Sequence, residues 1–382
     1  MERPPNIRHL ATLAATVRHG SLTRAARAVN LTQPALTQAI SGLEQALQVT
    51  LFDRGTGGMR PTPAASLLAS RAEAAIEHIG SPRVTGTQLR AFLAVARGGS
   101  YLAAAEATGL SSASLHRAVA DLSHALGQGL VERRGKGIAL TAAGVRRARA
   151  FGLALAEMRA GFEEVAALQG KGRGRIVIGA MPLSRARWLP EAIAEFVRQA
   201  PDVDIAVHEG SHAELAIPLR DGEIDLMLGA LRSDVEVSDL VQEPIFEDRP
   251  VIVMRTGHPL LRDDTPAAKM LRFPWLVSSR GTPLRMHWEN MMKAMGHEPP
   301  HVSIECGSVM MLRQLLLAGD ALTLLARDQV SVELEAGVLA AIPPPVPVVR
   351  TIGIATRAGW RPTQTQSRFL SILRAQGRSA AS

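Results

Sequence analysis

Two runs of polar side chains in the first third of the chain contain the residue types that bind nucleic acid. Amide, hydroxyl and guanidinium groups at the exposed start of a helix can hydrogen-bond to base edges in the major groove of DNA. The first run comprises Thr32, Gln33, Pro34, Thr37 and Gln38. The second run lies 79 residues further along and comprises Ser111, Ser112, His116 and Arg117. Each run predicts a surface that reads bases.

Basic side chains follow each run after a short interval. The glycine-containing segments that carry them are typical of a two-stranded wing beside a helix-turn-helix. The predicted phosphate-binding residues are Arg54 and Arg60 after the first run, and Arg133, Arg134 and Lys136 after the second. Contacts to phosphates fix the position of a protein on DNA without reading its sequence. The two kinds of residue together predict binding of double-stranded DNA.

The charge of the chain is concentrated in the same region. Residues 1–150 contain 18 Lys and Arg against 8 Asp and Glu, which gives a net charge of +10, whereas the whole chain has +8. The remaining residues contain 25 Lys and Arg against 27 Asp and Glu, which gives −2. A basic module joined to a nearly neutral one favours a polyanionic partner for the first module alone.

Each polar run needs a helix to present it, and the same set of elements occurs twice. Helices are expected over residues 7–18 and about 22–29, with Ser21 as the N-cap of the second helix. Asn30 is expected in a left-handed turn, and Thr32 is expected to cap a third helix. A shift of 79 residues superposes Leu36, Leu43 and Leu47 on Leu115, Leu122 and Leu126. The pattern predicts two helix-turn-helix units, and ordinary three-helix bundles with polar surfaces are the alternative.

The stretch GSLTRAARAVNLTQPALTQAISGLEQALQVTLFDR resembles the winged helix-turn-helix of LysR-type transcriptional regulators. The resemblance covers residues 7–65 and is carried by QPAL, the LE pair and the LF-x-R tail. The second copy resembles the family more loosely, because Ser112 and Ala113 replace the Gln-Pro pair. The usual family member has one such module. The resemblance therefore implies a tandem pair, with copy one over residues 1–80 and copy two over 84–140.

A long helix is expected over residues 141–170, followed by a flexible basic hinge at 171–175. Apolar residues along the helix recur at alternating spacings of three and four, which is the pattern of a two-stranded coiled coil. This seam comprises Phe151, Leu155, Met158, Phe162 and Val165. In the resembled family a linker helix at this position pairs two subunits, so the seam is expected to form a dimer interface. A core helix within one chain is the alternative.

Strands and helices alternate from residue 176 onward, which predicts an α/β fold with a mainly parallel sheet. The wording LRDGEIDLMLGALR resembles the effector domain of the same regulators, a two-lobed fold like that of type 2 periplasmic binding proteins. The domain is expected over 176–376, with a tail at 377–382. Lobe one is expected at about 176–250 and 351–376, and lobe two at about 251–350. The whole chain is thus expected to be multi-domain, with two mainly helical winged units, a linker helix and this domain.

Small molecules in α/β folds bind beyond the carboxyl ends of strands, where hydroxyls and helix N-termini suit a carboxylate. Three such loops predict an effector site. Its residues are Met181, Leu183 and Ser184 after the first strand, Ser278, Ser279 and Thr282 in the second lobe, and Gly307 and Ser308 before a later helix. Arg280 and Arg285 are expected to pair either with an anionic ligand or with surface acids, and Cys306 is expected to fill apolar space. The hydroxyls could alternatively be plain helix caps.

Several function classes are not supported by the sequence. The chain lacks His-Glu-x-x-His, Cys-x-x-Cys and Gly-x-Ser-x-Gly motifs, so neither an enzyme nor a bound metal or cofactor is expected. His208 with Glu209, or His212 with Glu214, would give two metal ligands without a third. The single cysteine excludes an intrachain disulfide framework. With no signal-like segment and no long apolar run, a cytoplasmic location without membrane contact is expected.

These observations predict a DNA-binding transcriptional regulator controlled by a small-molecule effector, and the resemblance implies an aromatic acid or a sugar-related metabolite as that effector. The expected partners are double-stranded DNA, the effector, further copies of the chain in a dimer or tetramer, and RNA polymerase. The alternative is a ligand-binding module in which one or both helix-turn-helix units serve dimerisation or protein contact.

Overall fold

The computed structural model describes residues 6–55, 58–135, 137–171, 174–232, 239–262 and 266–380. Lys136, residues 172–173 of the predicted hinge and residues 381–382 of the predicted tail lie outside these ranges. Arg54 is described by its backbone alone. No helix in the described ranges is long and apolar enough to cross a bilayer.

The first unit of the chain is a helical bundle with a two-stranded sheet. Its turn is set by Asn30, which has a φ of 53° as predicted, and by Thr32, whose hydroxyl accepts a hydrogen bond from Ala35 N over 3.4 Å. Glu44 ties the last helix to the sheet, because its Oε1 accepts hydrogen bonds from the backbone N–H groups of Leu51 and Phe52. The elements are α1 (Ile7–His19), α2 (Leu22–Ala28), α3 (Gln33–Leu47), β1 (Phe52–Gly55) and β2 (Gly58–Pro61).

The second unit repeats this order of elements. Its turn uses Gly109 with a φ of 68°, and Ser111 caps the third helix by accepting from Ser114 N over 3.2 Å. The units differ at the middle helix, where Ser100 caps through its side chain but Ser21 makes no such hydrogen bond. The elements are α5 (Gly86–Gly98), α6 (Tyr101–Thr108), α7 (Ser112–Leu126), β3 (Val131–Arg134) and β4 (Gly137–Leu140).

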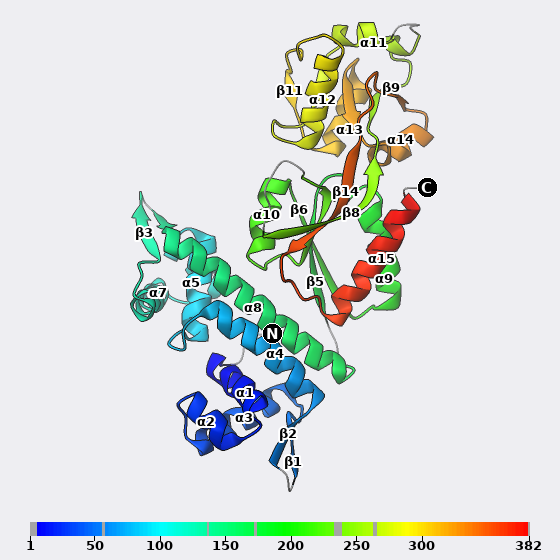
Figure 1. The fold of residues 1–382 in the computed structure, drawn as a ribbon. Coiled ribbons are helices and arrows are strands. Elements are labelled where there is room, and N and C mark those ends of the chain that lie inside the picture. The colour runs from blue at the N-terminus through cyan, green and yellow to red at the C-terminus, as the bar shows by residue number, and fades with distance from the viewer. Residues whose placement is uncertain are drawn as a thin grey trace.

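Helices α4 (Pro63–Ile79) and α8 (Ala142–Leu168) follow the two units and pack against each other in opposite directions (Figure 1). At one end, a Cβ built on Gly161 would lie 3.0 Å from Leu68 Cδ1. At the other end, Arg147 Nη1 donates to the carbonyl oxygen of Ile79 over 3.3 Å. The small Gly161 thus permits the close helix approach that the long contact requires.

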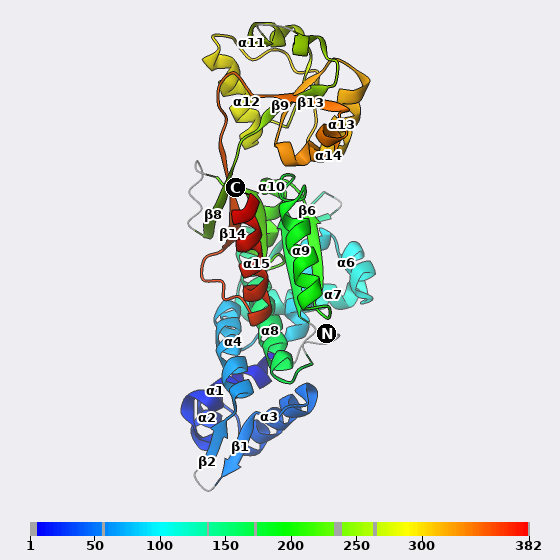
Figure 2. The same ribbon diagram turned by 90° about the vertical axis from the view of Figure 1, so that its right-hand side faces the viewer.

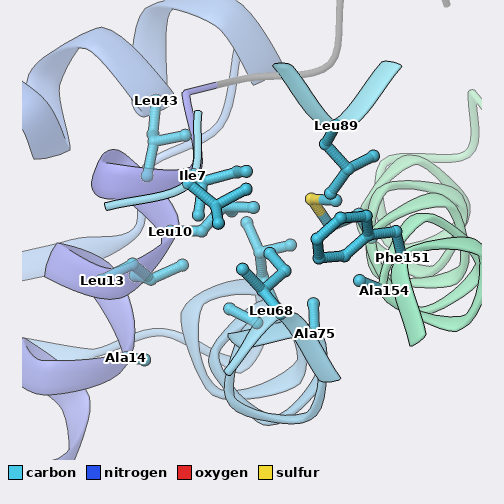
Figure 3. Packing of buried hydrophobic residues seen from close by; sticks show 14 of the residues in the cluster. Ile7, Leu10, Leu13, Ala14, Leu43, Leu68, Ala75, Leu89, Phe151 and Ala154 are labelled. Carbon is cyan, nitrogen blue, oxygen red and sulfur yellow. The ribbon is translucent and has the colours of Figure 1, made fainter. Parts of the chain in front are cut away.

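The apolar seam of α8 is covered within one chain, which corrects the expected dimer interface. Phe92 of α5 packs edge-to-face on Phe151, with ring centroids 6.0 Å apart, and α4 covers the rest (Figure 3). The five residues predicted to pair two subunits are Phe151, Met158, Phe162 and Val165, which are buried, and Leu155, which is partly buried. The sequence pattern specified a helical partner for this seam, and the partner is α4 because α4 has an apolar face of its own to bury.

Both units and both long helices share one hydrophobic core, which runs from Ile7 to Val165. We call this assembly, residues 6–171, the head. Its core contains Leu, Ile, Val and Ala with few aromatic rings, as the composition predicts. Because the two units are joined through the α4–α8 pair, the head is one packed body rather than two independent modules.

Lobe one of the C-terminal half is a five-stranded sheet in the order β6-β5-β7-β14-β8. Strands β5, β6 and β7 are parallel, whereas β14 runs antiparallel to β7 and β8. Helices α9 and α15 pack together, and α10 lies near β7 and β14. The elements are β5 (Arg175–Ala180), α9 (Trp188–Gln199), β6 (Asp204–Glu209), α10 (His212–Arg220), β7 (Leu226–Ala230), β8 (Leu240–Asp248), β14 (Arg350–Arg357) and α15 (Gln364–Ala380).

Lobe two is a second five-stranded sheet in the order β11-β10-β12-β9-β13. The chain enters it after β8 and leaves it before β14, so two crossings connect the lobes (Figures 1 and 2). The strands are β9 (Val251–Arg255), β10 (Trp275–Val277), β11 (Ile304–Glu305), β12 (Leu322–Leu325) and β13 (Leu339–Ile342). The helices are η1 (Pro259–Arg262), α11 (Pro266–Lys269), η2 (Met270–Arg272), α12 (Pro283–Ala294), α13 (Val309–Ala318), η3 (Arg327–Val330) and α14 (Ser331–Glu335).

The head contacts lobe one along α8. A Cβ built on Gly152 would lie 2.2 Å from the carbonyl oxygen of Asp221, so this backbone approach requires glycine. Further along α8, Arg159 Nη2 donates to Asp225 Oδ1 over 3.0 Å. Lobe one is therefore seated on the same helix whose other face closes the core of the head.

A buried arginine connects α4, α8 and the C-terminal half at this contact. The side chain of Arg71 on α4 is 6% exposed and donates to both carboxylate oxygens of Glu164 on α8, over 3.1 and 2.6 Å. Its Nη1 also donates to Glu157 Oε2 over 3.1 Å and to the carbonyl oxygen of Arg361 over 2.9 Å. Four charge-assisted hydrogen bonds thus connect α4, α8 and the C-terminal half.

Candidate functional site

The polar face of α3 presents the first predicted set of base-reading residues. Thr32, Gln33, Pro34 and Gln38 are exposed on it. Thr37 is half-buried, and its hydroxyl donates to the carbonyl oxygen of Gln33 over 3.0 Å. The amide groups of Gln33 and Gln38 on this face can each offer a donor and an acceptor to one base.

The corresponding face of α7 is partly occupied by its own unit. Ser112 Oγ donates to the carbonyl oxygen of Tyr101 over 3.3 Å, and the His116 ring lies against the Tyr101 ring with centroids 4.9 Å apart. Ser111 serves as the cap of α7. Arg117 is exposed and is the charged side chain on this face, so the two units offer different chemistry at equivalent positions.

The predicted phosphate-binding residues lie on the two short antiparallel sheets. Arg60 on β2 lies opposite Asp53 on β1 in the strand register, and Arg133 and Arg134 lie on β3. All three arginines are exposed. Arg54 lies on β1 opposite Met59, and the placement of Lys136 is outside the described ranges. Each unit therefore has a two-stranded sheet that carries at least one exposed arginine.

A cleft of about 760 Å³ lies between the two lobes. Both lobes line it, and the walls combine apolar groups with hydroxyls, arginines and carboxylates. Of the predicted effector residues, six line this cleft: Met181, Leu183, Ser278, Ser279, Thr282 and Gly307. A volume of this size fits a small organic ligand.

Two predicted effector residues do not line the cleft. Ser184 is fully buried, and its hydroxyl donates to the carbonyl oxygen of Met181 over 2.9 Å. Ser308 caps α13 by accepting from Met311 N over 3.4 Å. Both side chains fold back on their own backbone, so the alternative of a plain structural hydroxyl holds at these two positions. Thr282 lines the cleft and also caps α12 by accepting from Arg285 N over 3.3 Å.

Four arginines line the cleft, and three of them have carboxylate partners. Arg185 pairs with Glu209 and Arg350 pairs with Asp248, while Arg280 lies 3.9 Å from Glu305 Oε1. For Arg285 the alternative of pairing with surface acids holds, because its buried side chain pairs with Glu289 over 2.7 Å and with Glu305 over 3.3 Å. Arg285 therefore supports the fold of lobe two rather than the cleft.

Arg232 is the cleft arginine that sequence reasoning missed. Its Nη1 donates to the carbonyl oxygen of Gly281 in the other lobe over 3.1 Å. Its Nε is buried and has no acceptor among the described residues. A buried guanidinium N–H without an acceptor is costly, and an anionic ligand would satisfy it. The only signal in the sequence was the position of Arg232 just after a buried strand.

The apolar side of the cleft includes Cys306, which is 8% exposed and was expected to fill apolar space. On the polar side, Ser211 donates to Glu214 through both its N–H and its hydroxyl, which lowers the pKa of that carboxyl. In the described ranges, no group of three His, Cys, Asp or Glu side chains is arranged to hold a metal ion. The walls thus suit an organic anion with an apolar body.

A small polar cavity lies where α8 meets lobe one, and Glu163 lines it. Burial raises the pKa of the Glu163 carboxyl to about 7, and the neighbouring Asp225 adds to this rise. Arg159 opposes the shift by stabilising the carboxylate. The contact between the head and lobe one therefore contains a group that titrates near neutral pH.

Comparison with protein families gives two matches. The model for the bacterial regulatory helix-turn-helix protein, lysR family, matches residues 7–66 and 87–145. The model for the LysR substrate binding domain matches residues 169–378.

Similar proteins are regulators. The HTH-type transcriptional regulator GalR of Pseudomonas putida is 31% identical over 369 residues, which cover 93% of each chain. The HTH-type transcriptional regulator PcaQ of Agrobacterium fabrum is 26% identical over 76% of this chain and 94% of its own. The crystal structure of ArgP from Mycobacterium tuberculosis has a similar fold, with a TM-score of 0.58 at 21% identity, and covers 76% of this chain and 97% of its own.

Proposed function

We propose, from the premise that the chain belongs to the LysR family of bacterial regulatory helix-turn-helix proteins, that it couples an acidic small molecule in its cleft to DNA binding by two winged units. The chain is an effector-controlled, DNA-binding transcriptional regulator and not an enzyme. The finer parts of the proposal concern the number of DNA-binding units, the effector and the assembly.

Both winged helix-turn-helix units are proposed to contact DNA, as modules over residues 1–80 and 84–140. The support is the repeated order of elements, with a polar helix face and exposed arginines in each unit. The alignment with PcaQ adds support, because it covers 94% of that protein but only 76% of this chain. A protein with one unit fewer would align in this way.

The basic wings are proposed to contact phosphates, which a salt titration tests. The double variant Arg133→Ala/Arg134→Ala should weaken binding to all duplexes and flatten the slope of log K against log salt by about 2, one per lost contact. Binding is measured by gel shift with DNA from upstream of the chain's own gene. Arg249→Ala is the control, because Arg249 is exposed in the C-terminal half and forms an ion pair with the exposed Glu247. An unchanged slope in the double variant would contradict a phosphate role for this wing.

The role of the second unit is open to one alternative for which the structure gives a reason. Ser112 is hydrogen-bonded to the carbonyl oxygen of Tyr101, and His116 packs on the Tyr101 ring. Helix α7 therefore offers fewer free groups to bases than α3 does. In that alternative, the second unit builds the head and contacts phosphates, while the first unit reads the sequence. A footprint that covers one unit only would favour it.

The effector is proposed to be a small carboxylic acid, such as an aromatic acid or a sugar acid. Arg232 carries this proposal, because it lines a cleft with both apolar and hydroxyl walls and its buried Nε has no acceptor among the described residues. A carboxylate between the lobes would contact Arg232 and the opposite loop at once. Closure of the lobes around it would then shift the population between two arrangements of the lobes relative to the head.

The effector proposal is tested by comparing acids with their own amides. Binding of a panel of aromatic and sugar acids is measured by calorimetry, and each ligand is paired with its neutral amide. Arg232→Ala should weaken the acid by about tenfold or more, the value of a charged hydrogen bond, and should leave the amide nearly unaffected. Arg249→Ala is again the control. Equal loss for acid and amide would show that Arg232 shapes the cleft without binding the charge.

The remaining partners follow from the role of such a regulator. Self-association to a dimer or tetramer, contact with RNA polymerase and action in the cytoplasm are proposed on this ground. Since the α8 seam is covered within the chain, self-association is proposed to use surfaces outside the head core. Sedimentation with and without RNA polymerase tests both partners.

A further inference from the structure

We infer that one chain by itself forms a complete two-fold head that fits a single inverted-repeat DNA site. The inference rests on the proposed DNA-binding role of both units and adds their geometry and stoichiometry. Proteins that bind inverted repeats usually supply the two-fold symmetry by pairing two subunits. Here the symmetry is between two halves of one polypeptide.

The axis of this symmetry passes between α4 and α8. Residues 79 apart are equivalent in the two units, so Ala75 on α4 corresponds to Ala154 on α8. Leu68 lies seven residues before Ala75, and its contact Gly161 lies seven residues after Ala154. An antiparallel pair with this spacing is centred on the two equivalent alanines.

The residues at the centre agree with this placement. Ala75 and Ala154 are 1% and 0% exposed, and Figure 3 shows both at the junction of the two helices. Small residues at equivalent positions allow two helices to cross closely at an axis. The Leu68–Gly161 contact and the repeat offset of 79 residues therefore place the axis at the same point.

The two units are arranged as the axis requires. In Figure 1 both units lie along one side of the α4–α8 pair, and the sheets β1–β2 and β3–β4 lie at opposite ends of it. The C-terminal half lies on the other side of the pair. The face that carries α3, α7 and the two basic wings is therefore left open for a partner.

The outer side of the helix pair does not share the symmetry. Arg71 holds Glu157, Glu164 and Arg361, whereas its equivalent in the repeat is Ala150. Because of this difference, the head has one contact site for lobe one, although it has two units on its DNA-facing side. One effector domain thus serves two half-sites.

The partner that fits this head is an imperfect inverted repeat. Gln38 and Arg117 occupy equivalent positions, and glutamine pairs best with adenine while arginine pairs best with guanine. The two half-sites should therefore be inverted relative to each other, as in a palindrome, but should differ in the base at the position that Gln38 or Arg117 contacts. A strict palindrome would suit one unit better than the other.

The stoichiometry of binding tests the inference. Duplexes are selected from a random library by the full-length chain, and a short duplex with one selected inverted repeat is titrated at concentrations well above its Kd. Saturation at one duplex per chain is expected, and this ratio holds whether the chains are monomers or oligomers. Saturation at one duplex per two chains would overturn the inference while leaving DNA binding intact. Failure to bind any duplex at low salt would overturn the proposed function as well.

Half-site variants give a second, independent test. Gln38→Ala should relax the base preference in one half of the selected site only, and Arg117→Ala should relax it in the other half only. Repeat selection with each variant measures this. If both substitutions alter the same half, or if each alters both halves equally, then one chain does not span the repeat.

Discussion

At the scale of single residues, Glu163 links the stability of the protein to pH. Its pKa is about 7 in the folded chain because burial disfavours the carboxylate, whereas an exposed Glu titrates near 4.5. The folded state therefore holds a proton that the unfolded state releases, and stability falls as pH rises from about 4.5 to about 7.

Glu163→Gln should remove this loss, because glutamine stays neutral at every pH. At pH 8 the variant should be more stable than the parent by about 1–3 kcal/mol, and at pH 4.5 the two should be nearly equal. Thermal unfolding at both pH values measures the difference. A shift of the same size at pH 4.5 and pH 8 would mean that packing, not titration, explains the effect.

The residue scale is also where sequence reasoning succeeded unevenly. The left-handed Asn30 was predicted and confirmed, because a turn between two helices restricts the backbone strongly. For Ser184 and Ser308 the sequence left a ligand contact and a structural hydroxyl as alternatives, because the direction of a hydroxyl depends on neighbours that only the fold brings near. Arg232 was missed because its importance comes from the opposite lobe.

At the scale of elements, the α4–α8 pair depends on a buried ion pair. Arg71→Ala would leave Glu164 without its cation and Glu157 with Arg361 alone, and these two carboxylate side chains are only 15% and 14% exposed. Breaking a buried pair in this way costs about 3–5 kcal/mol. Urea unfolding of the full chain, followed by circular dichroism, measures the loss.

The matched control is Arg18→Ala, which also removes an arginine from the head. Arg18 pairs with Glu73 of α4 over 2.8 Å, but both side chains are well exposed. Exposed pairs contribute about 0–1 kcal/mol, so this variant should unfold close to the parent. Equal destabilisation by the two substitutions would show that the burial of Arg71 is not what matters.

The elements themselves were largely readable from the sequence, because periodicity and caps are local. The seam of α8 shows the limit of that reading. Alternating spacings of three and four specify that a helix packs beside Phe151 and Met158, but they do not say whether that helix belongs to the same chain. The answer depended on α4, whose apolar face packs on the seam in the folded chain.

At the scale of the whole molecule, Gly152 sets how lobe one sits on the head. In a helix interior, alanine is more favourable than glycine by about 1 kcal/mol, so Gly152→Ala would normally stabilise α8. Here the added Cβ would lie 2.2 Å from a backbone oxygen of Asp221. The variant should therefore lose about 1–3 kcal/mol through overpacking, and lobe one should move away from α8.

Thermal unfolding and the radius of gyration from small-angle X-ray scattering measure these two effects. Gly86→Ala is the control, because a Cβ at Gly86 of α5 would have no neighbour within 4 Å. A compact, fully stable Gly152→Ala chain would refute the idea that this close approach holds the two halves together.

Both units of the head are carried on one polypeptide, and this changes how occupancy depends on cellular copy number. If both units contact DNA as proposed, binding of the first unit would hold the second beside its half-site without another chain, because the two units share one core. A regulator that must first assemble from subunits loses sites steeply on dilution. This chain should keep a nearly linear dose response down to a handful of molecules per cell.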